Sequence, residues 1–294
     1  MKGSSRRSGA GRPSGGGMRR SLAFLLVGGL LGGAAVYVLG PRIGGPSGDR
    51  RQEESPGTTP TKAVPADTPA DFEPAGGGRG VIALVLDDLG NGEPAIVRAG
   101  QLPGPIALAV LPDAPASGSA AALARRKGWD LLVHLPLRAE SGASRPDAIS
   151  SADTEQEIVE AIGRAIERLP GAIGVNNHQG SAAMADRRVV RTLLQTVRDR
   201  HLFFLDSRTT PARIAEEEAR SLGAPLLVRD VFLDADGEAG MAAAWERARK
   251  LALRKGSAIV IAHPHTETLD FLARELPRLE TQGLRLVKIS ELVD

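Results

Sequence analysis

The sequence predicts an α/β domain in which helices cover a mainly parallel sheet. Short apolar runs alternate with stretches of helical periodicity from about residue 79 to residue 294, so that strand and helix repeat about seven times. Polar residues gather where the apolar runs end. This pattern is typical of either a barrel or an open sheet, and for a domain of this length we expect a compressed (β/α) barrel.

The apolar runs give the expected strands, which cover 81–87, 105–111, 130–134, 172–176, 202–206, 225–228, 258–262 and 285–287. The expected helices cover 93–100, 116–127, 153–168, 186–199, 211–222, 239–255 and 266–282. At the start of the third helix, Asp153 is the candidate N-cap and Gln156 occupies the capping-box position. The glycines expected at helix C-termini are Gly128, Gly171, Gly223, Gly256 and Gly283.

The N-terminal part of the chain has a different character. Residues 1–20 form a basic arm, and 21–40 is an uncharged apolar stretch of the length that crosses a bilayer core of roughly 30 Å. Because basic residues precede this stretch, it predicts a single-pass membrane anchor, with the N-terminus in the cytoplasm and the following domain outside it. The alternative is a cleaved signal peptide, but the apolar run is long for one and no clear A-x-A site follows it.

Residues 41–79 are rich in Pro, Gly, Thr, Ser and charge, so they predict a disordered linker that leads to a folded domain at 80–294. In the apolar stretch, the pairs Gly28/Gly32 and Gly29/Gly33 have the small-xxx-small spacing that permits close helix pairing. A homodimer through the transmembrane helix is therefore compatible with the sequence.

The composition restricts the kinds of site that the chain can form. It has no cysteine, which excludes disulfides and thiolate zinc sites and leaves His, Asp and Glu as metal ligands. The formal net charge of +2 gives no reason to expect a nucleic-acid partner, and 3% aromatic residues leave few stacking platforms for bases.

Histidines and aspartates lie at the ends of the expected strands. Asp87 and Asp88 end the first strand. His134, His178 and His263 each end a later strand. Because the carboxyl ends of parallel strands meet at one edge, we expect these side chains to lie together. Two imidazoles and a carboxylate can hold a zinc ion, which lowers the pKa of bound water to about 7. A second carboxylate can then accept a proton, and a further histidine can donate one to the leaving group.

Other polar residues are candidates for a supporting role. Asp206 ends the strand over 203–206 and could orient a histidine or bind the metal itself. His265 is a further candidate, with a solvent-facing position as the alternative. Asp230 and Asp234 share a face by alternation, where they either support the site or form salt bridges. Four short polar side chains are suited to bind hydroxyls or an oxyanion of a substrate, and these are Asn176, Asn177, Ser181 and Ser207.

Each candidate also has an ordinary structural interpretation. Asp87 and Asp88 could be a helix N-cap with a solvated neighbour. His134 or His178 alone would more often be a hydrogen-bonded core or loop histidine than a metal ligand. Their occurrence together with the Asp pair favours metal binding.

Six motifs carry a resemblance to a known family. They are LDDLG at 86–90, HLPL at 134–137, GVNNHQGS at 174–181, FFLDSRTT at 203–210, RDVFLD at 229–234 and IAHPHTET at 261–268. In this order they resemble the divergent polysaccharide deacetylases, a bacterial envelope family related to the NodB-type carbohydrate deacetylases. The resemblance spans roughly 81–292. It implies a deformed (β/α)7 barrel and hydrolysis of an N- or O-acetyl group on a sugar with a divalent metal, usually zinc.

The resemblance also implies roles for single residues. Asp87 matches the general base and Asp88 the metal-binding aspartate. The better-known relatives take two histidines from one H-x-x-x-H turn, which this sequence lacks. His134 is the first histidine candidate here and His178 the nearest second one, while His263 is the candidate proton donor.

Three functions follow as hypotheses. The leading one is a membrane-anchored extracytoplasmic hydrolase that removes acetyl groups from an envelope polysaccharide or peptidoglycan. The missing H-x-x-x-H turn motivates the second, a catalytically inactive scaffold that binds glycan or protein. The third is a metal-dependent hydrolase acting on another acyl or phosphoryl bond, since a fold alone does not fix the substrate.

Overall fold

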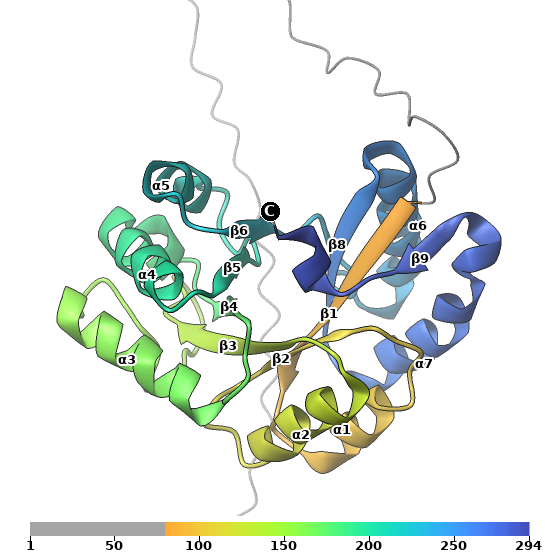
Figure 1. The fold of residues 1–294 in the computed structure, drawn as a ribbon, viewed down its shortest axis with the longest axis horizontal. Coiled ribbons are helices and arrows are strands. Elements are labelled where there is room, and N and C mark those ends of the chain that lie inside the picture. Colours follow the sequence, from red (N-terminus) through yellow and green to blue (C-terminus); the bar gives the residue numbers. More distant parts are fainter. Residues whose placement is uncertain (1–79, 294) are drawn as a thin grey trace, which may run out of the picture. The chain divides into compact units, whose positions relative to one another are not determined.

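All strand pairings in the computed structural model are parallel, and the structure describes residues 80–293. The strands are β1 Gly80–Leu89, β2 Ala107–Val110, β3 Leu131–Leu137, β4 Gly174–Gln179, β5 Phe203–Asp206, β6 Leu226–Val228, β7 Val231–Phe232, β8 Ser257–Ala262 and β9 Leu284–Leu286. Their order in the sheet is β6-β5-β4-β3-β2-β1-β8-β7, and β9 pairs with β1. Within the described residues no ladder joins β6 to β7, so the sheet curls without closing (Figure 1).

Helices cover the outer side of this curled sheet (Figure 1). They are α1 Glu93–Ala99, α2 Ser117–Lys127, α3 Glu155–Arg168, α4 Arg187–Asp199, α5 Ile214–Leu222, α6 Gly237–Lys255 and α7 Thr266–Glu275. Short 3-10 turns lie at Ala183–Ala185, Leu276–Arg278, Glu280–Gln282 and Ile289–Leu292. The predicted parallel α/β architecture is thereby confirmed as a curled, helix-covered sheet.

The strands carry two hydrophobic clusters because both of their faces are buried. Ile82, Leu84 and Leu86 of β1 belong to the cluster between the sheet and the helices. The alternate residues Ala83 and Val85 belong to a second cluster on the concave side, which we call the inner cluster. The inner cluster is composed of Ala83, Val85, Ala107, Ala109, Leu132, Phe203, Leu205, Ile259, Ile261, Val287 and Ile289.

Three details differ from the sequence prediction. The N-cap of α3 is Thr154, whose side chain accepts from the Glu157 amide in a capping box, whereas Asp153 accepts from Ser150 in the preceding turn. The helix expected over 266–282 ends at Glu275 and continues as 3-10 turns, because Pro277 cannot donate a helical hydrogen bond. Strand β7 was not expected, since two residues are too short to show a periodicity.

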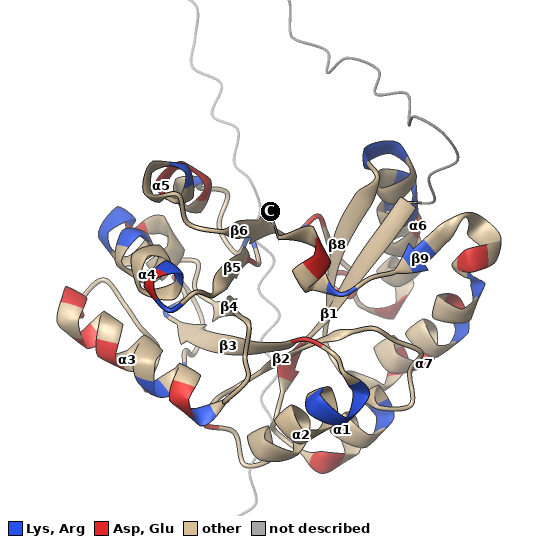
Figure 2. Ribbon diagram, in the orientation of Figure 1, with Lys and Arg blue, Asp and Glu red and all other residues tan. Residues whose placement is uncertain are grey.

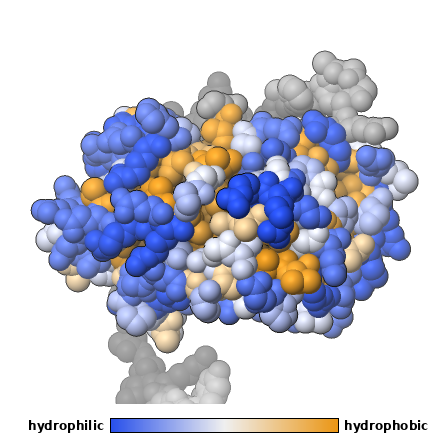
Figure 3. All heavy atoms as spheres, turned by 60° about the horizontal axis from the view of Figure 1, so that its bottom comes forward, coloured by the Kyte–Doolittle hydropathy of each residue, from blue (hydrophilic) through white to orange (hydrophobic). Residues whose placement is uncertain are grey.

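Charged side chains lie mainly along the covering helices and their ends (Figure 2). The face shown in Figure 3 is hydrophilic over most of its area, with smaller apolar areas between. No helix within residues 80–293 is long and apolar enough to cross a bilayer. The predicted basic arm, transmembrane helix and linker at 1–79 lie outside the described residues.

Candidate metal centre

Strand alternation directs the polar residues at the strand ends into the concave side of the sheet. Side chains two residues apart on a strand share a face. Val85, Leu132 and Ile261 belong to the inner cluster. Asp87, His134 and His263 each follow one of these residues by two positions along the chain, in that order. These polar residues therefore continue the inner cluster at the carboxyl edge of the sheet. Asn176 and His178 join them from β4, in register with His134 and Pro136 of β3.

Asp88 reaches the same place by a different route. Alternation alone would direct it to the opposite face from Asp87. The pairing of β1 with β2 is irregular between Leu86 and Leu89, and Asp88 has a left-handed φ of 57°. A bulge of this kind re-aims a side chain. Both aspartates consequently contribute to one site.

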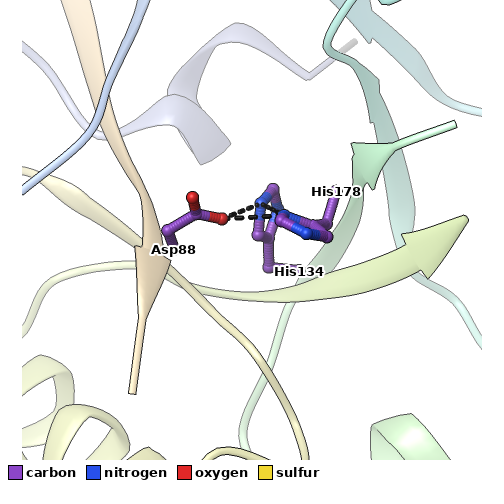
Figure 4. A group of neighbouring side chains, drawn as sticks. All are labelled: Asp88, His134 and His178. Atoms are coloured by element: carbon purple, nitrogen blue, oxygen red, sulfur yellow. Dashed lines mark hydrogen bonds and ion pairs between the residues drawn. The ribbon is translucent and has the colours of Figure 1, made fainter. Parts of the chain in front are cut away.

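Three side chains bring their ligand atoms into mutual contact (Figure 4). Asp88 Oδ1 lies 3.0 Å from His134 Nε2 and 2.8 Å from His178 Nδ1. The two ring nitrogens are 3.2 Å apart. Four-coordinate zinc has ligand bonds of about 2.0–2.2 Å, which would separate neighbouring ligand atoms by roughly 3.3–3.5 Å. The observed sides of 2.8, 3.0 and 3.2 Å are all shorter than that spacing, the shortest by about 0.5–0.7 Å.

The hydrogen bonds around His134 favour a cation in this triangle. Its Nδ1 lies 2.8 Å from Asn176 Oδ1, and Asn176 Nδ2 donates to Asp87 Oδ1 at 2.8 Å. The amide oxygen can only accept, so we assign the ring proton to Nδ1. In the neutral ring, the Nε2 lone pair then faces the Asp88 carboxylate, an arrangement that a bound metal would stabilise.

The two aspartates have different electrostatic environments. Asp87 is 2% exposed, and this burial raises the pKa of its carboxyl, although His134 and the Asn176 hydrogen bond oppose the rise. Burial also opposes ionisation of Asp88, but hydrogen bonds to His134 and His178 outweigh it and lower the pKa of that carboxyl. Asp88 is thus suited to bind a cation as the anion, and Asp87 to exchange a proton.

His263 faces the triad from β8. Its Nε2 lies 3.8 Å from Asp88 Oδ2, and its Nδ1 lies 3.1 Å from Asp234 Oδ1. The other oxygen of Asp234 accepts from the His263 amide and from Thr268 Oγ1, which fixes the carboxylate. Burial alone would lower the pKa of His263, but the hydrogen bond and charge of Asp234 raise it. The ring of Phe232 packs edge-on against His263, with centroids 5.0 Å apart.

A cavity of about 440 Å³ opens over these groups. It is lined by Asp87, Asp88, His134, Asn177, His178, Gln179, Ser207, Arg208, Thr209, Arg229, Phe232 and His263. Three residues of this lining have a left-handed backbone conformation at or just after the end of a strand: Asp88, Gln179 and Arg208. Such conformations are concentrated at functional sites.

The remaining predicted residues fall into two groups. Asn177 and Ser207 line the cavity, and Asn177 Oδ1 accepts from the Ser207 amide at 2.8 Å. Ser181 lies outside the cavity lining, where its hydroxyl accepts from the Glu140 amide. His265 is exposed and precedes α7. Ser181 and His265 are therefore not among the groups that the structure brings together over the triad.

Asp206 also differs from the expectation. Leu205 belongs to the inner cluster, so Asp206 lies on the opposite face of β5. Its Oδ1 accepts from the Arg208 amide, and burial raises the pKa of this carboxyl. It lines a neighbouring cavity instead of the one over the triad.

Of Asp230 and Asp234, which alternation predicts to share a face, only Asp234 contacts His263. Asp230 accepts from the Ile259 amide and lies 3.6 Å from Lys255 Nζ. Asp234, His263 and His265 form a second group of potential ligands, yet the oxygens of Asp234 are already engaged in hydrogen bonds. Four further residues line the cavity and were not named as site candidates, although each lies in one of the six motifs: Arg229, Phe232, Gln179 and Thr209.

One family model matches nearly the whole of the described domain. Residues 84–293 match the family model described as divergent polysaccharide deacetylase. The chain is 33% identical over 222 residues to the uncharacterized protein YibQ of Escherichia coli, covering 73% of this chain and 68% of YibQ. It is 32% identical over 213 residues to an uncharacterized protein of Haemophilus influenzae, covering 72% of this chain and 76% of that protein.

The fold is shared with a protein of known structure. An uncharacterized protein from Agrobacterium tumefaciens superposes with a TM-score of 0.70 at 22% sequence identity. The match covers 74% of this chain and 93% of the other. At this level of identity the likeness shows the fold alone.

Proposed function

Because the chain belongs to the divergent polysaccharide deacetylase family, we propose that its folded domain is a metal-dependent hydrolase that removes acetyl groups from an envelope polysaccharide or peptidoglycan. One observation carries the proposal. Asp88, His134 and His178 form a compact set of ligand atoms, and a buried carboxyl and a carboxylate-bound histidine flank it.

The metal would be held by Asp88 Oδ1, His134 Nε2 and His178 Nδ1, and zinc suits two imidazoles and a carboxylate. A bound divalent ion supplies Lewis-acid chemistry, which polarises an acyl oxygen and makes water more acidic. The protein's own contribution to this site is orientation. Asn176 fixes the ring of His134, and the bulge in β1 fixes Asp88.

Asp87 is the proposed general base. Its Oδ1 accepts from Asn176, while its Oδ2 lies 3.8 Å from His134 Nε2 and faces the triad. The raised pKa of this carboxyl makes it a stronger proton acceptor than an exposed aspartate. In the hydrolysis, Asp87 accepts the proton that the attacking water loses as the new C–O bond forms.

His263 is the proposed general acid. Asp234 accepts a hydrogen bond from Nδ1–H of His263 and stabilises the imidazolium, so that Nε2 can carry a second proton toward the cavity. When the acyl bond breaks, His263 donates this proton to the leaving amine or hydroxyl. Ser207 Oγ in the cavity wall is a candidate partner for a sugar hydroxyl, with the Asn177 side chain holding the Ser207 backbone in place.

The proposal includes a location. Residues 21–40 would anchor the protein in the bacterial inner membrane, permit a homodimer, and place the domain in the periplasm or outside the cell. The linker over 41–79 would let the domain reach an envelope glycan.

The test is acetate release by the full-length protein from acetylated glycans, with and without a chelator. The proposal predicts release that zinc restores after chelation. The alternative, a catalytically inactive scaffold, was motivated by the missing H-x-x-x-H turn. It predicts no release from any acetylated glycan, even though the protein binds the glycan.

A further inference from the structure

A second cavity adjoins the one over the triad. Its volume is about 460 Å³, and the two cavities share Arg208, Thr209 and Arg229 in their walls. The rest of the second cavity is formed by residues 206–213 after β5, together with Glu216 and Asp230. A substrate bound at the triad would therefore have the charged side chains of Arg208 and Arg229 beside it.

The three arginines in the wall of the second cavity, Arg208, Arg213 and Arg229, differ in whether a carboxylate lies close to them. Glu216 lies in contact with Arg208, at 2.6 Å, and with Arg213, at 3.5 Å. Arg229 has no carboxylate oxygen within 4.0 Å of its guanidinium in the region covered by residues 80–293. Its donors instead contact two backbone carbonyl oxygens, those of Ser207 at 2.7 Å and Arg208 at 3.2 Å.

The guanidinium of Arg229 is also held in a fixed orientation. It stacks over the ring of Phe232 at 4.9 Å, and Phe232 in turn packs against His263. Its carbonyl partners belong to the segment where Arg208 has a left-handed φ of 50°. Burial lowers the pKa of Arg229, yet an arginine stays protonated at neutral pH. A preorganised, partly buried cation without a carboxylate partner is a suitable binding site for an anion.

The acidic residues nearby limit which anion would fit. Asp206 and Asp230 line the same cavity, and Asp230 is near Lys255. Asp206, Asp87 and Asp230 all act on Arg229 as nearby negative charges, and they repel a doubly charged phosphate more strongly than a single carboxylate. Arginine also binds a carboxylate with two parallel hydrogen bonds.

We propose that Arg229 binds a carboxylate of the substrate, so that the acetylated glycan is an acidic one. The inference rests on the proposed hydrolase function and names the substrate class of the same site. The acetylated sugar lies over the triad, and the carboxylate, on that sugar or its neighbour, contacts the exposed edge of the Arg229 guanidinium. Arg229 is then a specificity-determining residue for substrate binding.

The test compares three acetylated oligosaccharides of equal length with the full-length protein. The first is the neutral N-acetylglucosamine oligomer. The second alternates N-acetylglucosamine with N-acetylmuramic acid, which carries an ether-linked lactyl carboxylate. The third alternates N-acetylglucosamine with a uronic acid, which carries a ring carboxylate. Binding is measured by calorimetry and acetate release is measured separately, so that a ligand can bind detectably without being hydrolysed.

We expect at least one acidic probe to bind about tenfold or more tightly than the neutral one, the usual worth of a charged hydrogen bond. The probe that shows this preference identifies the source of the carboxylate. Arg229→Gln should reduce the ratio of acidic to neutral binding toward one, and Arg229→Lys should retain part of it because the charge remains. Arg125→Gln makes the same change on the exposed end of α2 and should leave the ratio as in wild type.

Two results would overturn the inference. Equal binding of all three probes by the wild type would show that no carboxylate is recognised. An equal loss on acidic and neutral probes in Arg229→Gln would show that Arg229 only positions the loop. If the ratio depends on Arg229 but no probe releases acetate, the carboxylate site stands and the hydrolase proposal fails.

Discussion

Asn176 connects the two halves of the proposed chemistry, because one amide contacts both the metal-binding ring and the base. Its oxygen accepts from His134 Nδ1, and its nitrogen donates to Asp87. Neither bond involves the substrate cavity, whose lining does not include Asn176. The sequence placed this residue among candidates for binding sugar hydroxyls, since a sequence does not show which neighbour a buried amide will contact.

We predict that Asn176→Ala weakens zinc binding by about 10–100-fold, the usual effect of losing a residue that orients a metal ligand. The measurement is competitive titration of zinc against a chelator of known affinity. Ser181→Ala is the control, because Ser181 is a polar residue of the same segment that lies outside the cavity lining. Unchanged zinc affinity in Asn176→Ala would remove the argument that this amide sets the tautomer of His134.

The base and the acid should be separable by pH. The rise in the pKa of Asp87 predicts that kcat/KM falls on the acidic side at a pH above the ordinary carboxyl value, since a protonated Asp87 cannot accept a proton. The raised pKa of His263 predicts a fall on the alkaline side, where the ring loses its proton. His263→Gln should lower the rate and abolish the alkaline fall. An alkaline fall of the same size in His263→Gln would exclude His263 as the acid.

Asp87→Asn keeps the shape of the side chain and removes its basicity. We expect this variant to retain metal and fold while kcat falls by about 10²–10⁴-fold, the usual contribution of a general base. Single-turnover acetate release, compared with the zinc content of the same sample, gives the result. Full activity in Asp87→Asn would assign the proton transfer to another group.

The sequence predicts which candidate side chains meet only where strand alternation determines the direction in which each side chain points. His134 of β3, His178 near the end of β4 and His263 just after β8 meet because alternation directs all three toward the inner face. Asp88 violates alternation through a bulge and a positive φ, neither of which a single sequence reveals. Arg229 opens the RDVFLD motif, but the sequence does not show its role, because its partners are backbone carbonyl oxygens, which carry no sequence pattern.

At the scale of elements, the buried strands were the easiest to predict. Both faces of a parallel sheet are covered, so its strands appear as continuous apolar runs. Helix ends were harder. Asp153 and Thr154 are both good caps and are followed by Gln156 and Glu157, so the sequence allows two capping boxes one residue apart, of which the structure has the second.

The position of the capping box at Thr154 is testable. Thr154→Ala should lower the free energy of unfolding by about 0.5–2 kcal/mol, the usual cost of removing an N-cap side chain. Thr154→Ser keeps the accepting oxygen and should retain most of the stability. Urea unfolding followed by circular dichroism measures both variants. Zinc content should be unchanged in both, because α3 packs on the outer side of the sheet and contributes no residue to the triad.

For the whole molecule, the proposed N-terminal anchor makes a prediction about where the folded domain lies. A reporter fused after residue 294 should be active only outside the cytoplasm, because the basic arm at 1–20 precedes the apolar stretch at 21–40. The protein should stay with the membrane fraction through high-salt washing. Recovery of a soluble mature form that begins near residue 41 would favour a cleaved signal peptide instead.

The central claim is that Asp88, His134 and His178 together hold one divalent ion. Elemental analysis of the gently purified full-length protein tests it most directly. We expect about one zinc per chain in the wild type. His178→Ala should lose most of this zinc, because it removes one of the three ligand atoms and leaves those of Asp88 and His134. A wild-type protein that contains no stoichiometric metal and binds none when zinc is added would contradict the account.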